Sequence, residues 1–193
     1  MVKYEQGLIK NNSEKTVSCY DFRIKKMVRY YNTIFSFDIE TTSTYIDGEK
    51  FAFMYEWTFG KLDNVSRETI CYGRSWNEFL TLYNEIVACY NTNEEKRCII
   101  WVHNLGYEFQ FMRKYFSFLS VFSVDERKPI KALTVDGIEF RDTYILSAMS
   151  LAKVADNLSE HTIEKMVGDL DYKLVRTEKT HLTEKELKYC END

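Results

Sequence analysis

Residues 35–42, with the sequence FSFDIETT, are the segment from which the rest of this chain can be interpreted. Their aromatic and β-branched residues predict a strand over 34–41. Successive side chains of a strand point to opposite faces, so Asp38 and Glu40 share one face near its end. Two neighbouring carboxylates repel each other unless a cation lies between them, and Mg²⁺ prefers such oxygens as ligands. The alternative interpretation is a strand end with two hydrated acids.

The composition describes a globular protein. The chain has 193 residues, of which 45% are hydrophobic and 16% aromatic, so one domain with a full core is expected. The formal net charge is −4 with no basic tail, so any nucleic-acid contact must be a local groove. No apolar run approaches the ~20 residues of a membrane span, and we expect no membrane partner. We predict a loose extension over 1–18 and a single domain over 19–193.

The cysteines indicate a reducing compartment. The five thiols are scattered along the chain and form no Cys-x-x-Cys pair. This argues against a zinc site and against a disulfide framework, because both need paired or regularly spaced cysteines. We therefore expect a cytoplasmic protein.

The order of the predicted elements indicates an α/β fold. Strands are predicted at 51–59, 68–72, 98–102, 119–124, 131–135 and 138–142. Helices are predicted after the capping box at Ser75, from 106 or 107 to 118, over 150–158, and from the capping box at Thr183 to the end of the chain. Asp136-Gly137 predicts a hairpin turn. Together these elements predict a mixed sheet flanked by helices, with functional groups at the strand ends.

Two further groups of polar residues lie downstream. His103–Glu108, with the sequence HNLGYE, follows the predicted strand at 98–102 directly. Glu108 falls in the first turn of the next helix, where an acid also favours the helix dipole whatever else it does. Near the end of the chain, Tyr189 and Asp193 are four residues apart and share one helix face. The alternative for this pair is a partly buried tyrosine and a hydrated acid.

Taken together, these three groups resemble the exonuclease motifs of the DEDD superfamily, in its tyrosine branch. The chain is most similar to the proofreading domain of protein-primed family B DNA polymerases of phages and linear plasmids. The resemblance rests on Asp38–Thr42 for the first motif, His103–Glu108 for the second, the run Gly168–Tyr172 (GDLDY), and Tyr189–Asp193 for the third. It covers roughly residues 34–193.

The resemblance implies a ribonuclease H-like 3′–5′ exonuclease that hydrolyses single-stranded DNA ends with two Mg²⁺ or Mn²⁺ ions. Asp38, Glu40, Glu108 and Asp193 would hold the metals, and Tyr189 would orient the attacking water. A further set of positions would bind the DNA strand: Thr41, Asn104, Tyr107, Phe111 and Thr143. The implied partners are a DNA 3′ end, a terminal priming protein and the remainder of a DNA-directed DNA polymerase.

The chain departs from the family pattern at two residues. Glu108 replaces the usual Asp, and its extra methylene moves the carboxylate outward. Val167 replaces a lysine that stabilises developing charge, so Lys165 is a candidate for that role. We expect the palm, fingers and thumb of a polymerase to lie outside these residues. Two rival hypotheses therefore remain: a catalytically weak fragment that binds single-stranded DNA or the priming protein, and a stand-alone DEDD nuclease acting on RNA.

Overall fold

The computed structural model describes residues 1–10, 15–62, 69–158 and 174–192. Its centre is a mixed sheet in the order β1-β6-β5-β4-β7-β10-β9-β8. The strands of this path are β1 Val2–Lys3, β4 Ile34–Ile46, β5 Glu49–Leu62, β6 Thr69–Gly73, β7 Lys96–Val102, β8 Phe118–Ser123, β9 Pro129–Thr134 and β10 Ile138–Asp142. β7 is parallel to both β4 and β10, whereas β4, β5 and β6 form an antiparallel meander. The predicted α/β architecture with a mixed sheet is confirmed.

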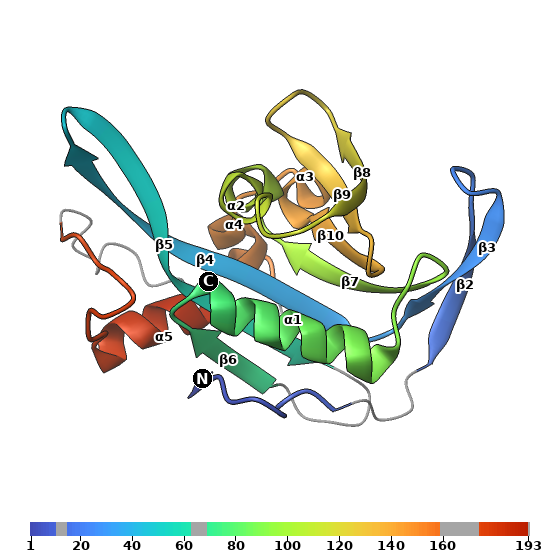
Figure 1. Ribbon diagram of the computed structural model, residues 1–193, viewed down its shortest axis with the longest axis horizontal. Helices are drawn as coiled ribbons and strands as arrows, with labels where there is room; N and C mark the ends of the chain where they lie inside the picture. Colours follow the sequence, from blue (N-terminus) through green and yellow to red (C-terminus); the bar gives the residue numbers. More distant parts are fainter. Residues whose placement is uncertain (11–14, 63–68, 159–173, 193) are drawn as a thin grey trace.

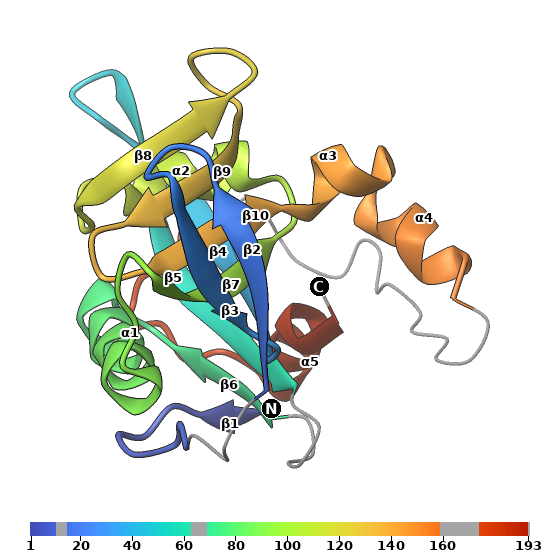
Figure 2. The same ribbon diagram turned by 90° about the vertical axis from the view of Figure 1, so that its right-hand side faces the viewer.

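Helices cover both sides of this sheet. They are α1 Trp76–Tyr90, α2 Leu105–Met112, α3 Thr143–Ser147, α4 Leu151–Asp156 and α5 Glu184–Asn192. Figures 1 and 2 show α1 on one side of the sheet and α5 on the other, with α3 and α4 on the same side as α5. No helix in the described part of the chain is long and apolar enough to cross a membrane.

The core lies between the sheet and α1. Phe35, Phe37 and Ile39 alternate along β4 and are buried on the α1 side, as the two-residue period of a strand requires. The ring of Phe37 stacks on Phe79 of α1 with 4.2 Å between centroids. Trp57 of β5 is fully buried in the same cluster. The face of β4 that carries Asp38 and Glu40 is therefore the opposite one, toward α5.

Both predicted capping boxes are present. At the start of α1, the Ser75 hydroxyl accepts from the Glu78 amide at 3.3 Å, and the Glu78 carboxylate accepts from the Ser75 amide at 3.0 Å. At the start of α5, Thr183 and Glu186 exchange the same two bonds at 2.7 and 3.2 Å. Each box satisfies two backbone donors that a helix start leaves open, which is why these short patterns locate the helices correctly.

Three elements differ clearly in length from their predictions. The helix predicted to reach 118 ends at Met112, because Phe116 and Phe118 turn toward the core and Phe118 begins β8. β4 and β5 run well beyond the predicted strands and meet at Asp47-Gly48. Both of these turn residues have positive φ, as a two-residue hairpin loop requires.

Residues 1–10, the first described part of the predicted loose extension over 1–18, are packed against the domain. β1 pairs in parallel with the open edge of β6, and Tyr4 and Ile9 are buried in the core cluster. The Tyr4 ring lies against Trp57 at 5.8 Å, and its hydroxyl donates to Glu85 at 2.8 Å. Pairing with a free sheet edge and packing in the core cluster therefore order residues whose own sequence is polar. The prediction also missed a hairpin formed by β2 (Thr16–Asp21) and β3 (Lys26–Tyr31), which joins β7 through β3.

Candidate active site

Asp38 and Glu40 lie on the face of β4 away from α1, as their shared parity predicts. In the antiparallel pairing with β5, Asp38 is opposite Thr58 and Glu40 is opposite Glu56. Like charges directly across a strand pair are unfavourable. The pairing slips by one residue immediately after Glu40, so this site also marks a β-bulge between Glu40 and Thr41.

Glu108 reaches the same region from α2. The chain turns at Asn104, whose left-handed backbone (φ 72°) precedes the first residue of the helix. The buried stripe of α2 then consists of Leu105, Glu108 and Met112, so the acid occupies a position that packing would otherwise give to an apolar side chain. Glu108 is only 3% exposed.

The environment of Glu108 brings this acid together with Asp38 and Glu40 of the first motif and with a further acid, Asp142. Burial, followed by the charges of Asp38, Asp142 and Glu40, raises the pKa of the Glu108 carboxyl to about 9. One of its oxygens, Oε2, has no hydrogen-bond partner among the described residues. Asp142 is itself buried at the end of β10 and caps α3, accepting from the Ile145 amide at 2.9 Å. At neutral pH and without a cation, Glu108 is therefore protonated.

Glu56 is an acid of this site that the sequence analysis missed. Its side chain is 0% exposed, and burial and the charge of Asp38 raise its pKa to about 8. The Thr58 hydroxyl donates to one carboxyl oxygen at 3.0 Å, while the other has no partner in the described part of the chain. A signal was present, since Glu56 is the only charged residue in the apolar run 51–59. We call Asp38, Glu40, Glu56, Glu108 and Asp142 the acidic cluster.

Helix α5 closes the acidic cluster through Cys190. Burial, and then the neighbouring carboxyls of Glu56, Glu40 and Asp38, raise the pKa of the Cys190 thiol far above its usual range. Tyr189, predicted to orient a water molecule, is buried beside Cys190 and packs with it near Met1. The terminal ammonium of Met1 pairs with Glu191 of the same helix. Cys190 of α5 thus lies beside the acids, although sequence reasoning did not single it out.

Three of the predicted strand-binding residues lie together at the base of the β4–β5 hairpin. The hydroxyls of Thr41 and Tyr107 are hydrogen-bonded to each other. The ring of Tyr107 contacts that of Phe111, one helical turn on, at 5.3 Å. Tyr107 is exposed and Phe111 is half-buried, so this pair presents aromatic surface to solvent.

Thr143, another predicted strand-binding residue, lies beside the second motif. Its hydroxyl is 3.1 Å from Nδ1 of His103. The His103 ring meets Tyr144 edge-on at 5.6 Å. His103 thus has a positioning contact with the start of α3, at the carboxyl ends of β7 and β10.

A cavity of about 300 Å³ lies directly beside Asp38, between the sheet and the helices α3 to α5. Its polar lining includes Asp38, Thr58, His103 and Thr143, and α4 contributes an apolar wall that includes Leu151 and Val154. The acids therefore adjoin a space large enough for a small ligand group.

The donor set suits a hard divalent cation in its chemistry. Carboxylate oxygens are what Mg²⁺ takes, and two carboxyls of the acidic cluster carry an oxygen with no described partner. Within the described ranges, however, no three His, Cys, Asp or Glu side chains converge closely enough to hold a metal ion as they stand. The predicted residues Asp193 and Lys165, and the run 168–172, lie outside the described residues.

We compared the chain with protein-family models, with curated proteins and with solved structures, and none of the three comparisons found a match.

Proposed function

We propose that this chain is a ribonuclease H-like 3′–5′ exonuclease domain, the proofreading part of a protein-primed family B DNA polymerase. It would remove nucleotides from single-stranded DNA ends by metal-assisted hydrolysis. The observation that carries the proposal is the environment of Glu108, whose pKa is raised by burial and by Asp38, Asp142 and Glu40. Acids that are distant in the sequence act on one carboxyl, as a shared catalytic centre requires.

The architecture supports the proposal without identifying the family. The order β6-β5-β4-β7-β10 and its mixture of parallel and antiparallel pairs are compatible with a ribonuclease H-like sheet. Asp142 ends β10 and Glu108 lies in the helix after β7, so both are at or beyond the carboxyl ends of neighbouring parallel strands, where α/β proteins place functional groups. Asp38 and Glu40 lie on β4 just past its pairing with β7.

The following predicted residues have a role in this proposal. Asp38, Glu40 and Glu108 would hold Mg²⁺ or Mn²⁺ together with Asp193, and the bound cations would supply an activated water and stabilise charge on the leaving oxygen. Tyr107 and Phe111 would receive unpaired bases on their rings, since every base has a face to stack on. Thr41 orients Tyr107 through their shared hydrogen bond. Thr143, held by His103, would contact the end of the strand.

The test is a cleavage assay on a 5′-labelled single-stranded oligonucleotide with Mg²⁺, Mn²⁺ or EDTA. We expect a descending ladder that needs metal and is lost in Asp38→Asn and in Glu40→Gln. Asp125→Asn, an exposed acid in the turn before β9, is the matched control and should cut like the wild type. Cleavage that persists in Asp38→Asn would contradict the proposal. Faster cleavage of RNA of the same sequence would instead support a DEDD nuclease acting on RNA.

A second function, strand binding without efficient cleavage, is favoured by one observation. Within the part of the chain that the structure describes, no three His, Cys, Asp or Glu side chains converge closely enough to hold a metal ion. A domain in this state would hold a DNA end without cutting it. Metal-independent binding of the oligonucleotide, with no ladder in either metal, would support this function over the first.

A further inference from the structure

The β2–β3 hairpin is an addition to the domain, separate from the acidic cluster. It lies before residue 34, outside the stretch that resembles an exonuclease, and it joins the sheet where β3 pairs with the start of β7. Figure 1 shows it projecting from the end of the sheet opposite the β4–β5 hairpin. Asp38, by contrast, lies within β4 just past its pairing with β7, and Glu108 lies in helix α2, which follows β7. The hairpin therefore presents its own surface.

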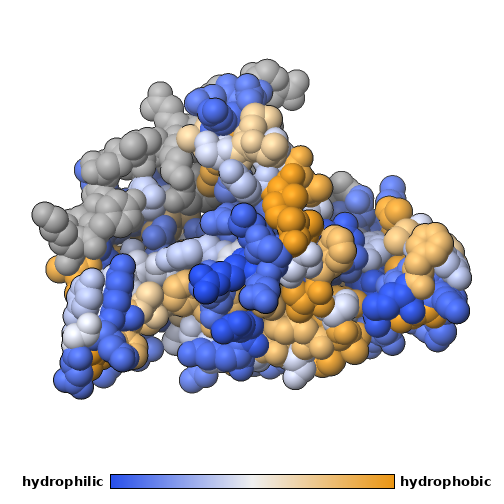
Figure 3. Space-filling view, turned by 90° about the horizontal axis from the view of Figure 1, so that it is seen from above, coloured by the Kyte–Doolittle hydropathy of each residue, from blue (hydrophilic) through white to orange (hydrophobic). Residues whose placement is uncertain are grey.

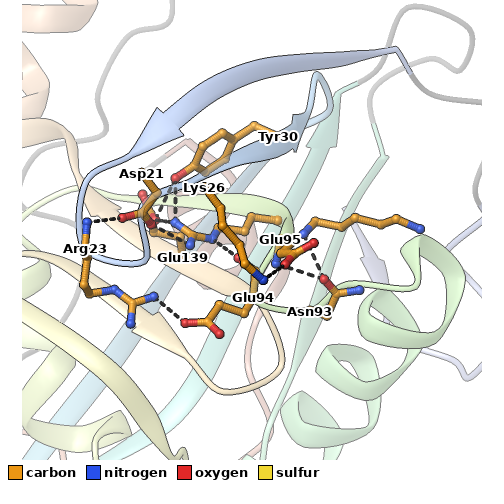
Figure 4. A network of polar contacts seen from close by, with 10 residues as sticks. Asp21, Arg23, Lys26, Tyr30, Asn93, Glu94, Glu95 and Glu139 are labelled. Atoms are coloured by element: carbon orange, nitrogen blue, oxygen red, sulfur yellow. Dashed lines mark hydrogen bonds and ion pairs between the residues drawn. The ribbon is translucent and has the colours of Figure 1, made fainter.

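A buried ion network fixes this hairpin in one orientation. Arg97 of β7 is 1% exposed, pairs with Asp21 of the hairpin at 2.6 Å, and donates to the Tyr30 hydroxyl at 3.1 Å. Glu139 of β10 accepts from Tyr30 at 3.1 Å and pairs with Arg97 at 3.6 Å. Figure 4 shows Asp21, Tyr30 and Glu139 together, beside the turn that precedes β7. A network of this kind defines geometry, because breaking it would leave a buried charge without a partner.

The opposite face of the hairpin is uncovered and carries aromatic and apolar side chains. Phe22 is 84% exposed, Met27 58% and Tyr20 46%. The Tyr20 and Phe22 rings meet edge-on at 5.0 Å, which leaves ring surface open. Tyr20 and Met27 are directly opposite each other in the strand pair, so both point the same way. Figure 3 shows apolar and hydrophilic side chains together at this end of the molecule.

The charge of the hairpin opposes that of the chain. Residues 16–31 contain four Lys or Arg and one Asp, a net charge of +3 in a chain of formal net charge −4. Arg23 and Lys26 pair with Glu94 and Glu95 at 2.8 and 2.5 Å. Lys15, Lys25 and Arg29 are exposed. Of these, Arg29 is on the face that carries Tyr20 and Met27. The uncovered face thus combines rings with the cation of Arg29, and Lys25 lies in the adjoining turn.

We propose that this face of the β2–β3 hairpin binds single-stranded nucleic acid, with bases on the Tyr20 and Phe22 rings and phosphates at Arg29 and Lys25. Rings that accept any base, beside cations that follow a backbone, are the combination used for strands without sequence preference. Unpaired bases are required because a duplex hides the faces that the rings would contact. The proposal concerns a surface apart from the acidic cluster and does not depend on cleavage.

The test measures binding of a fluorescein-labelled oligothymidylate by anisotropy, in EDTA and in the Asp38→Asn background, so that nothing is cut. We expect Tyr20→Ala/Phe22→Ala to weaken binding at least tenfold. Lys25→Glu/Arg29→Glu should weaken it similarly. The slope of log affinity against log salt should also become shallower by about 0.7 for each phosphate that this variant no longer neutralises. Tyr20→Phe/Phe22→Tyr should retain the wild-type affinity.

The matched control is Tyr45→Ala/Lys50→Glu on the β4–β5 hairpin, whose exposed ring and cation lie next to each other across the strands. It should bind like the parent protein. Crosslinking of an iodouracil-containing strand, followed by peptide mapping, should place the adduct within residues 16–31. Unchanged affinity in both hairpin variants, or no crosslink within residues 16–31, would overturn the proposal. Polyglutamate that binds as tightly as the oligothymidylate, and equally well to Tyr20→Ala/Phe22→Ala, would also overturn it. The hairpin would then recognise an acidic peptide.

Discussion

The two faces of β4 differ in a way that separates stability from chemistry. Toward α1, the odd residues Phe35, Phe37 and Ile39 are buried among rings and need no polar partner. Toward α5, the even residues Asp38 and Glu40 meet Glu56 across the strand pair, and two neighbouring carboxyls have raised pKa values. One strand therefore carries complementary packing on one face and mutual repulsion on the other. Its acidic face costs stability, as functional sites generally do.

The largest expected effect breaks the apolar face. Phe37→Ala removes a fully packed ring from its stack on Phe79, and we expect it to lower the free energy of unfolding by about 3–5 kcal/mol. Ser36→Ala, one residue away on the other face, should change it by less than about 0.5 kcal/mol. Urea unfolding followed by fluorescence measures both. Equal losses in the two variants would contradict the assignment of the faces.

A smaller effect concerns the acidic face and pH. Glu108 and Glu56 have raised pKa values, so the folded chain binds more protons than the unfolded chain between about pH 4.5 and 9. Stability contributed by these protons is present at low pH and is lost as pH rises through the raised values. Without metal, we expect the wild type to lose about 1–3 kcal/mol of unfolding free energy between pH 5 and about 9.

Amide variants sharpen this expectation. Glu108→Gln and Glu56→Gln cannot ionise, so each should flatten the alkaline loss, and the double variant should flatten it most. Glu95→Gln, an exposed acid paired with Lys26, is the control and should leave the slope of the free energy against pH unchanged. A wild-type stability that rises between pH 5 and 9 would show that the carboxyls are not buried as described.

Addition of a divalent cation should reverse part of the same loss. A cation that binds the folded chain stabilises it by mass action, and with saturating Mg²⁺ or Mn²⁺ we expect a gain of about 1–2 kcal/mol at pH 8. The gain should be absent in Asp38→Asn/Glu40→Gln. Thermal unfolding with increasing metal measures it, and a gain of equal size in the double variant would place the cation elsewhere.

The smallest expected effect concerns the aromatic pair beside the site. Tyr107→Phe removes the hydrogen bond to Thr41 but keeps the ring, and because Tyr107 is exposed the stability cost should stay below about 1 kcal/mol. If the ring receives bases, oligonucleotide affinity should fall much less in Tyr107→Phe than in Tyr107→Leu. Similar losses in both would assign the contact to the hydroxyl.

Local signals were sufficient for much of the fold and for part of the site. The capping boxes at Ser75 and Thr183 and the shared face of Asp38 and Glu40 are short-range features, and the structure has them where the sequence predicts them. The sequence analysis missed Glu56 because its position opposite Glu40 depends on the register of two strands, which no single segment specifies. The helix α2 was predicted too long because Phe116 and Phe118 satisfy helical and core-packing patterns equally well.

The β2–β3 hairpin was missed for a different reason. Its residues do not alternate between apolar and polar, and the side chain that anchors it, Arg97, lies on a distant strand. Similarly, the sequence of residues 1–10 does not by itself predict β1, since the partner of this strand is the open edge of β6. Elements whose stability comes from a neighbour rather than from their own pattern remain out of reach of sequence reasoning.

The parallel position of β7 between β4 and β10 has a consequence for how the chain folds. Its pairs, such as Phe35 with Ile100, join residues that are far apart in the sequence, so they form late and slowly compared with the β4–β5 hairpin. Glu108 can approach Asp38 only once β4 and β7 are side by side. We therefore infer that the carboxyls come close enough to repel each other only near the end of folding. Mutations at the acidic cluster should then change the unfolding rate more than the folding rate.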